Sequence, residues 1–520
     1  MSAAVPAVFE AVKIDYAAIA PMLVVALGAL IGVLVEAFVG RTSRSAVQLG
    51  VAVVTLLAAM VALWVWAAPN KGVTLGQSMS IDGPTIFLQG ALLLFGLLGV
   101  LAMSERFGGS SADAFTPMGA SAPGSVQEGA ATKAGYQTTE VFPLALFAIF
   151  GMMIFVGAND LITMFVALEV FSLPLYILTG LARRRRLLSQ EASLKYFLLG
   201  AFSSAFFLFG AALLYGFAGS SDFKLIARAI TTNSSMMNGL LLPGTILVLI
   251  GLLFKVGAVP FHSWTPDAYQ GAPTPVTGFM AAATKAAAFG AILRFTYVAV
   301  EAGRWDWRLV VGIIAAITMI VGAVMSVTQT DMKRLLAYSS VAHAGFILVG
   351  VLAFDATAIG GVMFYLVAYG LATIAAFAIV ALVRQGGSEA THLSQWAGLG
   401  KKHPVLAGLF GLLLLAFAGI PLTSGFTAKF AAFAPAVAHG GTMGVVLVVV
   451  GVLASAVTAY VYFRIIVLMY FTEPAEDVAA LTPSVTTTVV VTVGVLATLL
   501  LGIVPSLVLD LAQQASLFLL

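Results

Sequence analysis

The chain has 520 residues, of which 61% are hydrophobic and only 9% are charged. Soluble domains carry about 25% charged residues, so this composition predicts an integral membrane protein. The net charge of +3 is too small to indicate nucleic-acid binding, and the lack of cysteine excludes disulfides and cysteine-held iron–sulfur or zinc sites.

Fourteen apolar runs of roughly 20 residues follow one another along the chain and predict transmembrane helices. The expected fold class is therefore an all-α integral membrane protein with about fourteen spans. A break at Ala418–Phe426 divides the twelfth run into two half-helices, and the longest polar stretch, residues 104–140, has the composition of a flexible loop. The predicted helices cover residues 17–39, 46–68, 83–103, 141–158, 160–181, 193–218, 240–263, 272–298, 309–328, 334–353, 358–383, 404–437, 443–471 and 484–509.

Basic residues in the connecting loops predict the orientation of these helices. When the loops are assigned alternately to the two sides, 13 Lys and Arg residues fall on one side and 6 on the other. The richer side is expected to be cytoplasmic, which places both termini outside. The composition, rich in Ala, Gly and Val, favours a bacterial plasma membrane over an organelle. The richer side holds Arg41, Arg44, Arg106, Lys133, Arg183, Arg184, Arg185, Arg186, Lys333, Arg334, Arg384, Lys401 and Lys402.

Four charged residues lie deep inside predicted helices, where each costs about 3 kcal/mol on insertion scales. They are Glu169, Lys255, Lys285 and Lys429. A buried ion pair that locks helices together is one explanation, but three lysines share one acid. A buried lysine without a partner relieves its desolvation by releasing a proton, so a row of such amines is suited to a proton relay. Glu169 would then bias the charge of Lys255 or of Lys195, which lies about three residues into its predicted helix and can instead extend to the interface.

Two histidines add to this hypothesis. His343 follows Ser339 by four residues and Ser340 by three, so both hydroxyls are expected on its helix face. An imidazole beside hydroxyls can pass a proton, although a histidine that only links core helices is an equal alternative. His262 follows Pro260 at the break in the seventh predicted helix, and the same two interpretations apply to it. The spacing of the five histidines gives no metal site.

The two broken helices predict an internal repeat. Pro260 interrupts the seventh predicted helix and Pro421 the twelfth, and a lysine lies near each break. Such breaks persist at membrane depth where they are buried in protein or line a wet cavity. Because the two helices are five apart, spans 4–8 and 9–13 form two candidate five-helix units, inverted relative to each other. Lys255 and Lys429 would then be equivalent positions. The chain divides into residues 1–140, with three helices and the polar loop, the units 141–298 and 299–471, and a C-terminal helix in 472–520.

Five motifs carry a resemblance to a known family and cover the chain from about residue 160 to 430. The sequence resembles the antiporter-like membrane subunits of respiratory complex I, the proton-pumping NADH:quinone oxidoreductase, and is most similar to their N type. "WTPDAYQGAPTPV" is the N-type form of a segment that usually reads "WLPDA" in the L and M types, and the long lateral helix that usually follows span 14 in the L type is absent. The motifs are "ALEVFSLPLYILTGLARR" (Ala167–Arg184), "EASLKYFLLGAFSSAFFLFG" (Glu191–Gly210), "FKVGAVPFHSWTPDAYQGAPTPVTGFMAAATKAAAFG" (Phe254–Gly290), "QTDMKRLLAYSSVAHAGFILVG" (Gln329–Gly350) and "AGIPLTSGFTAKF" (Ala418–Phe430).

The resemblance implies a role for each matched position. Glu169 looks like the family's glutamate of the fifth helix, and Lys195 like the lysine of the sixth. Lys255 looks like the lysine of the broken seventh helix, Lys285 like the linking lysine of the eighth, and Lys429 like the lysine of the broken twelfth. The polar loop after the third helix is larger than expected for the family.

The resemblance also implies the function and the partners. The chain would be a proton-translocating subunit with no cofactor of its own, while NADH, FMN, iron–sulfur clusters and quinone would bind partner subunits. Its direct neighbours would be the M-type subunit, small membrane subunits and the lipid bilayer, without nucleic acid. A subunit of a multisubunit cation/proton antiporter, a membrane-bound hydrogenase-type or formate-linked complex, and a passive scaffold held by buried charges are the alternatives.

Overall fold

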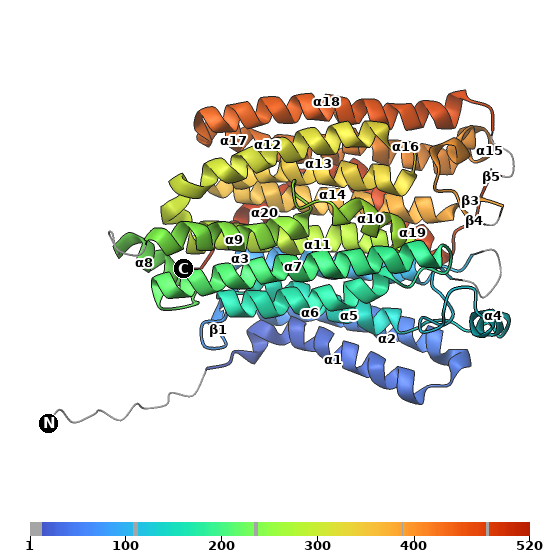
Figure 1. Ribbon diagram of the computed structural model, residues 1–520, viewed down its shortest axis with the longest axis horizontal. Coiled ribbons are helices and arrows are strands. Elements are labelled where there is room, and N and C mark those ends of the chain that lie inside the picture. Colours follow the sequence, from blue (N-terminus) through green and yellow to red (C-terminus); the bar gives the residue numbers. More distant parts are fainter. Residues whose placement is uncertain (1–12, 108–112, 233–237, 387, 475–477, 520) are drawn as a thin grey trace.

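The computed structural model describes residues 13–107, 113–232, 238–386, 388–474 and 478–519 as a bundle of long helices that run roughly along one axis. Helix α1 lies at one edge of the bundle and α18 at the opposite edge (Figure 1). The N-terminal region has three long helices, two of which begin at aspartate caps. Its elements are α1 (Tyr16–Phe38), α2 (Arg41–Ala62), the π-helical turn η1 (Leu63–Ala67), the hairpin strands β1 (Gly72–Thr74) and β2 (Met79–Ile81), and α3 (Gly83–Met103).

The polar stretch 104–140 differs from the loop that its composition predicts. Its described residues include the helix α4 (Val126–Lys133), which Ser125 caps. Phe115 is buried, and the Thr116 N–H donates to the Leu181 carbonyl at 2.9 Å. Glu128 pairs with Arg186 at 3.2 Å. The expectation of a loop without regular structure was therefore wrong for this segment, because one buried aromatic ring and several polar contacts attach it to the helical bundle.

The middle of the chain contains the first broken helix. Helix α9 ends at Val256, and the short α10 starts eight residues later, so the chain is interrupted around Pro260 as the sequence predicts. Helix α8 was not predicted, and it connects α7 to the segment before α9. The elements here are α5 (Val141–Gly157), α6 (Leu161–Thr179), α7 (Arg186–Ala218), α8 (Phe223–Thr232), α9 (Asn238–Val256), α10 (Trp264–Gly271), α11 (Thr274–Arg294) and η2 (Phe295–Ala299).

The last part of the chain contains the second break, between Ala418 and Ser424, within the segment that the sequence predicts. Strands β4, β3 and β5 form a small antiparallel sheet in that order. The elements are η3 (Glu301–Gly303), α12 (Arg304–Thr328), α13 (Met332–Val351), α14 (Ala356–Leu382), β3 (Val383–Gln385), β4 (Ser388–Glu389), η4 (Leu393–Trp396), α15 (Leu399–Lys402), α16 (Pro404–Ala418), α17 (Ser424–His439), α18 (Gly441–Phe471), β5 (Val478–Ala480), α19 (Val485–Ile503) and α20 (Ser506–Gln514).

The helices overlap all fourteen predicted segments, and 12 of those in the described ranges are long and apolar enough to cross a membrane. The all-α membrane fold is confirmed, whereas the count of fourteen crossings, the inverted repeat and the division into units stay predictions. Helices α5, with 17 residues, and α16, with 15, are apolar too, but they are shorter than the 12 that are long enough to cross a membrane. Some boundaries were wrong: α7 begins at Arg186 instead of residue 193, and α9 ends at Val256 instead of residue 263. The last predicted helix is divided near Pro505, where proline cannot continue the helical hydrogen bonds.

The buried centre of the bundle is formed by three helices. In the most apolar stretches of α11 and α14, 100% of the residues are buried by other parts of the protein, and in that of α13 94% are buried. Outer helices such as α18 expose large apolar side chains, among them Val449 and Leu453. An apolar exterior is favourable in lipid, and polar groups in the enclosed parts of α11, α13 and α14 are shielded from it by the surrounding helices.

Candidate functional site

Lys255 lies in the last turn of α9 and is buried against α6. Its Nζ donates hydrogen bonds to Ser172 Oγ at 2.8 Å and to Tyr176 Oη at 3.2 Å. The ring of Tyr176 also lies 5.4 Å from the Nζ, within cation–π range. Gly200 of α7 makes room for this arrangement, since a Cβ there would collide with Tyr176 Oη. The ammonium group is therefore held by neutral oxygens and aromatic faces.

Glu169 lies one turn before Ser172 on α6 and is half-buried. It accepts a hydrogen bond from Ser204 Oγ of α7 and forms no ion pair with Lys255 or Lys195. A bias of Glu169 on the charge of either lysine therefore stays a prediction. Ser172, which accepts from Lys255, lies one turn after Glu169 on α6.

Lys285 lies in the enclosed helix α11, next to the first helix break. Its Nζ donates to the Ser340 carbonyl of α13 at 2.7 Å and to the Val256 carbonyl at 3.4 Å. Val256 is the last residue of α9 and directly follows Lys255, so the end of α9 connects the two lysines. The break leaves this carbonyl without a helical partner and thereby supplies an acceptor.

Lys429 lies in α17, beyond the second break. Its Nζ donates to the carbonyls of Phe417 and Ala418 at 3.2 and 2.9 Å, and to Ser455 Oγ of α18. Gly419 has φ of +82°, and a Cβ at this position would lie 3.1 Å from the Nζ. The broken end of α16 thus forms the binding pocket of the ammonium group. Lys429 follows its break whereas Lys255 precedes its own, so the two lysines differ in their position relative to the breaks.

His343 of α13 lies between Lys285 and Lys429. Its ring centroid is 4.7 Å from that of Tyr369, whose ring also faces the Lys285 Nζ at 5.7 Å. On the other side, the His343 ring is 5.9 Å from that of Phe417, whose carbonyl accepts from Lys429. The imidazole therefore fills the space between the second and third lysines.

The hydrogen-bond partner of His343 is not one of the two predicted serines. Nδ1 shares a 2.7 Å hydrogen bond with Tyr365 Oη of α14, and Nε2 has no hydrogen-bond partner. Ser339 instead bonds to Tyr462 Oη, and Ser340 Oγ lies 3.4 Å from Tyr269 Oη. The rotation of α13 about its axis decides which partners His343, Ser339 and Ser340 reach. The spacing of these residues in the sequence does not encode that rotation.

Lys195 and His262 lie outside the row that Lys255, Lys285, His343 and Lys429 form. The Lys195 side chain is 47% exposed and pairs with Glu191 at 2.7 Å and with Asp267 at 3.2 Å. Because α7 begins seven residues earlier than predicted, Lys195 lies in its third turn and not near its start. His262 is half-buried in the interrupted segment between α9 and α10, where its Nδ1 has no hydrogen-bond partner.

None of the three row lysines forms an ion pair within the residues that the structure describes. Helix-locking ion pairs therefore do not explain them. In the same ranges, no group of three or more His, Asp or Glu side chains could hold a metal ion. The geometry brings Lys255, Lys285, His343 and Lys429 together as a row of buried polar groups, and the half-buried Glu169 lies one turn from the Ser172 that Lys255 contacts.

Sequence reasoning missed several buried cations, among them Lys333 and Arg294. Lys333 was assigned to a loop, but its side chain is 2% exposed and its Nζ donates to the Ala272 carbonyl at 2.6 Å. Arg294 has no acid near it in sequence, yet it pairs with Asp82 at 2.7 Å, with both side chains fully enclosed. Burial by itself raises the pKa of the Asp82 carboxyl, but the Arg294 guanidinium outweighs burial and holds that pKa below its usual range. A sequence signal existed for Asp82, which directly precedes an apolar helix and caps it.

The Asp82→Ala variant is expected to lower the free energy of unfolding by about 3–5 kcal/mol, since it leaves the Arg294 guanidinium buried without its acid. Denaturant unfolding of the full chain in detergent, followed by circular dichroism, measures this loss. The control is Glu301→Ala, which removes the exposed partner of Arg304 and should cost under about 1 kcal/mol. Equal losses in the two variants would contradict a structural role for the buried pair.

Comparison with known proteins places the chain in a family. The family model described as "NADH:quinone oxidoreductase/Mrp antiporter, TM" matches residues 158–458. A protein of Saccharopolyspora erythraea named NADH-quinone oxidoreductase subunit N is 55% identical over 506 residues, which are 96% of this chain and 97% of that protein. A protein of Streptomyces griseus named NADH-quinone oxidoreductase subunit N 3 is 53% identical and covers 98% of this chain and 95% of its own length.

Solved structures show the same fold. A chain of respiratory complex I from Thermus thermophilus with bound aureothin is 32% identical, with a TM-score of 0.75 over 95% of this chain and 99% of that chain. A chain of the Mrp complex from Dietzia superposes with a TM-score of 0.78 over 96% of both chains at 23% identity, which shows likeness of fold alone. The chain belongs to the family of membrane-spanning subunits shared by NADH:quinone oxidoreductases and Mrp antiporters.

Proposed function

We propose that this chain is the N-type, proton-translocating membrane subunit of an NADH:quinone oxidoreductase, and that Glu169, Lys255, Lys285, His343 and Lys429 carry the protons. One observation carries the proposal. Three lysines are buried in a row and are held by hydroxyl and carbonyl oxygens, with no carboxylate paired to them in the described structure.

Neutral ligands suit a group that must change its charge. A carboxylate partner would fix each lysine as an ammonium ion, whereas a hydroxyl such as Ser172 Oγ can accept from the ammonium or donate to the free amine. The charge on one lysine also acts on the next. At about 4 Å, two unit charges interact by about 1–4 kcal/mol for effective dielectrics of 80 to 20. Adding or removing one proton in the row can therefore shift the protonation of its neighbours severalfold.

The residues of the row lie in a fixed order, and the proposal assigns a direction of proton movement along it. Glu169 and Lys255 form its first end, Lys285 connects to it through the Val256 carbonyl, and Lys429 forms the last end beyond His343. The proposal assigns the first end to cytoplasmic proton uptake, Lys285 to the connection, and Lys429 to release. Lys195 and His262 lie outside the row and have no part in it.

The electron-transfer chemistry belongs to other subunits in this proposal. The relatives named NADH-quinone oxidoreductase subunit N support assembly into such a complex, where NADH, FMN, iron–sulfur clusters and quinone would bind partner chains. The M-type subunit and small membrane subunits would be direct neighbours. The proposed location is a bacterial plasma membrane, with both termini on the outer side.

Purification of the tagged native chain in mild detergent tests the assembly. We expect a large complex containing flavin and iron–sulfur clusters to co-purify and to catalyse NADH-driven quinone reduction. Reconstituted vesicles should then take up or release protons as NADH is oxidised. Isolation with a few membrane proteins and sodium-linked proton exchange without NADH oxidation would instead establish the antiporter alternative.

A further inference from the structure

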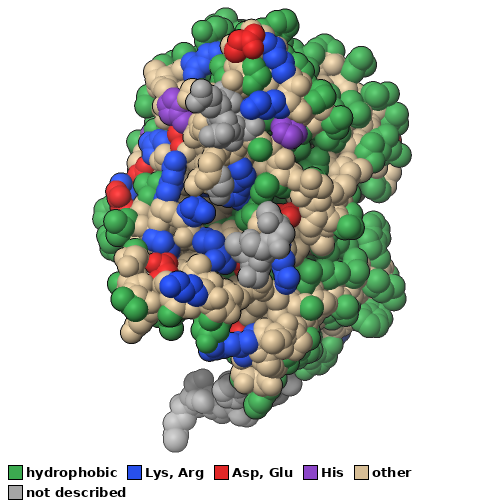
Figure 2. Space-filling model, turned by 90° about the vertical axis from the view of Figure 1, so that its right-hand side faces the viewer, with side chains coloured by type: hydrophobic (Ala, Val, Ile, Leu, Met, Phe, Trp, Pro, Cys, Tyr) green, Lys and Arg blue, Asp and Glu red, His purple; other side chains and the backbone are tan. Residues whose placement is uncertain are grey.

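A cavity of about 540 Å³ lies at the end of the bundle that carries β3 and β4, apart from the lysine row. Figure 2 shows that Lys and Arg side chains gather on this end of the molecule. We call this cavity the arginine pocket. Five cations and two carboxylates line it: Arg183, Arg184, Arg185, Lys333 and Arg384, with Asp113 and Glu389.

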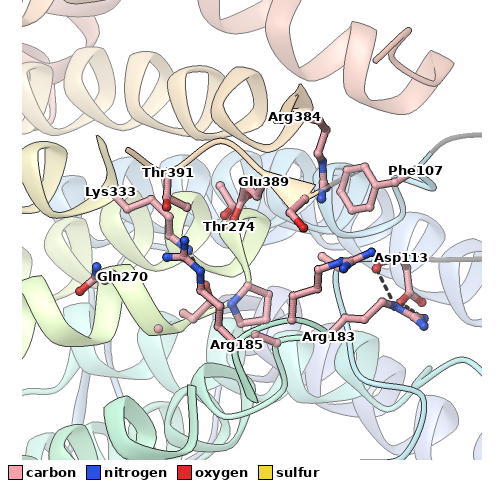
Figure 3. Close-up of a pocket in the computed structure, with 17 residues that line it drawn as sticks. Phe107, Asp113, Arg183, Arg185, Gln270, Thr274, Lys333, Arg384, Glu389 and Thr391 are labelled. Carbon is pink, nitrogen blue, oxygen red and sulfur yellow. Dashed lines mark hydrogen bonds and ion pairs between the residues drawn. The ribbon is translucent and has the colours of Figure 1, made fainter. Parts of the chain in front are cut away.

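The positive charge of the arginine pocket is only partly compensated. Arg183 pairs with Asp113 at 2.9 Å, as Figure 3 shows, and Arg185 reaches Asp331 at 4.0 Å. Arg184 and Arg384 form no ion pair with any residue that the structure describes.

Arg384 is the most informative of these cations. Its guanidinium stacks on the Phe107 ring at 3.9 Å, and its Nε is buried without a hydrogen-bond partner. Burial lowers the pKa of Arg384, the Glu389 carboxylate raises it, and the neighbouring Arg184 guanidinium lowers it. Two guanidinium groups that share a cavity and are not in ion-pair contact with its carboxylates are an arrangement that an anion stabilises.

The first turn of α11 reaches the same cavity. Thr274 opens this 21-residue helix, lines the cavity and is 2% exposed, and its hydroxyl has no hydrogen-bond partner. No side chain caps the helix N-terminus. The free N–H groups and the helix dipole attract negative charge at such a position. Figure 3 shows Thr274 between Lys333 and Arg384 in the pocket.

We propose that the arginine pocket binds a phosphate group, held by the guanidinium groups of Arg184 and Arg384 and by the first turn of α11 with the Thr274 hydroxyl. A tetrahedral phosphate offers oxygens to two guanidinium groups and one hydroxyl at once, which a single carboxylate cannot do equally well. The phosphate belongs either to the headgroup of an anionic phospholipid or to a free anion. This inference goes beyond the proposed proton translocation and does not rest on it.

The test measures binding to the full chain in a nonionic detergent, with two probes. Inorganic pyrophosphate is titrated by calorimetry at low ionic strength, and retained phosphatidylglycerol is counted by native mass spectrometry against phosphatidylcholine. The variants are Arg184→Gln with Arg384→Gln, and Thr274→Val, which keeps every charge. The control is Lys401→Gln with Lys402→Gln in α15, which removes two positive charges at the same end of the bundle.

We expect binding to weaken about tenfold or more in the double arginine variant, since one charge-assisted hydrogen bond already corresponds to about tenfold in affinity. Thr274→Val should weaken binding about threefold to tenfold, and the lysine control should bind like the wild type. Saturable pyrophosphate binding with this pattern identifies a free anion as the occupant, and selective phosphatidylglycerol retention with this pattern identifies a lipid. Failure of both probes to bind, or equal binding by the arginine variant and the lysine control, would overturn the proposal.

Discussion

The Lys285→Met variant is expected to lose proton translocation almost completely while the chain still folds and assembles. Methionine is similar to lysine in volume and one atom shorter, and it cannot carry a proton or donate to the Ser340 and Val256 carbonyls. In the proposed relay, Lys285 connects the two ends of the row. We expect the rate to fall at least about tenfold, which corresponds to about 1.4 kcal/mol in the barrier. Proton movement in vesicles of the reconstituted complex, measured per NADH oxidised, is the readout.

The matched control for this variant is Lys401→Met, because Lys401 is exposed and pairs with Glu473 at the surface. It should translocate protons like the wild type. If the lysines only stabilised the packing of the helices, Lys285→Met would keep its proton-to-electron ratio and would unfold at the same or a higher temperature, since replacing a buried charge by an apolar side chain is often stabilising. That result would favour the passive scaffold over the relay.

The sequence alone predicted the elements that depend on composition and local chemistry. Apolar runs located the long helices, prolines located both breaks, and the rarity of charge inside these runs singled out Lys255, Lys285 and Lys429. These features follow from the cost of polar groups in lipid, which acts on each segment separately. The same reasoning could not say whether any two of these side chains meet.

The contacts depend on helix rotation and on segments far apart in the chain. His343 bonds to Tyr365 of α14 and not to the serines one turn away, and Lys285 reaches a carbonyl of α9. Lys333 was predicted to lie in a water-exposed loop because it is at the start of a helix. Neighbouring segments instead bury it, with 2% of its surface exposed. Periodicity describes one helix at a time, so tertiary packing of this kind leaves no signal in it.

The Lys255→Ala variant is the second large loss that we expect, because it removes the lysine at the proposed entry of the row. Its Nζ is the group that Ser172 Oγ and Tyr176 Oη hold, and alanine leaves both hydroxyls facing an empty space. Proton uptake from the cytoplasmic side should fall at least about tenfold if the step loses about 1.4 kcal/mol or more of stabilisation. The initial rate of NADH-driven proton movement in reconstituted vesicles measures this.

Two milder variants separate proton transfer from packing at the same position. Tyr176→Phe keeps the ring that faces the Lys255 ammonium and removes one hydrogen bond, so it should slow uptake less than Lys255→Ala does. Glu169→Gln keeps the acceptor for Ser204 and removes a negative charge. It should therefore slow uptake less than Lys255→Ala does. Full activity in both Glu169→Gln and Lys255→Ala would exclude both residues from the relay.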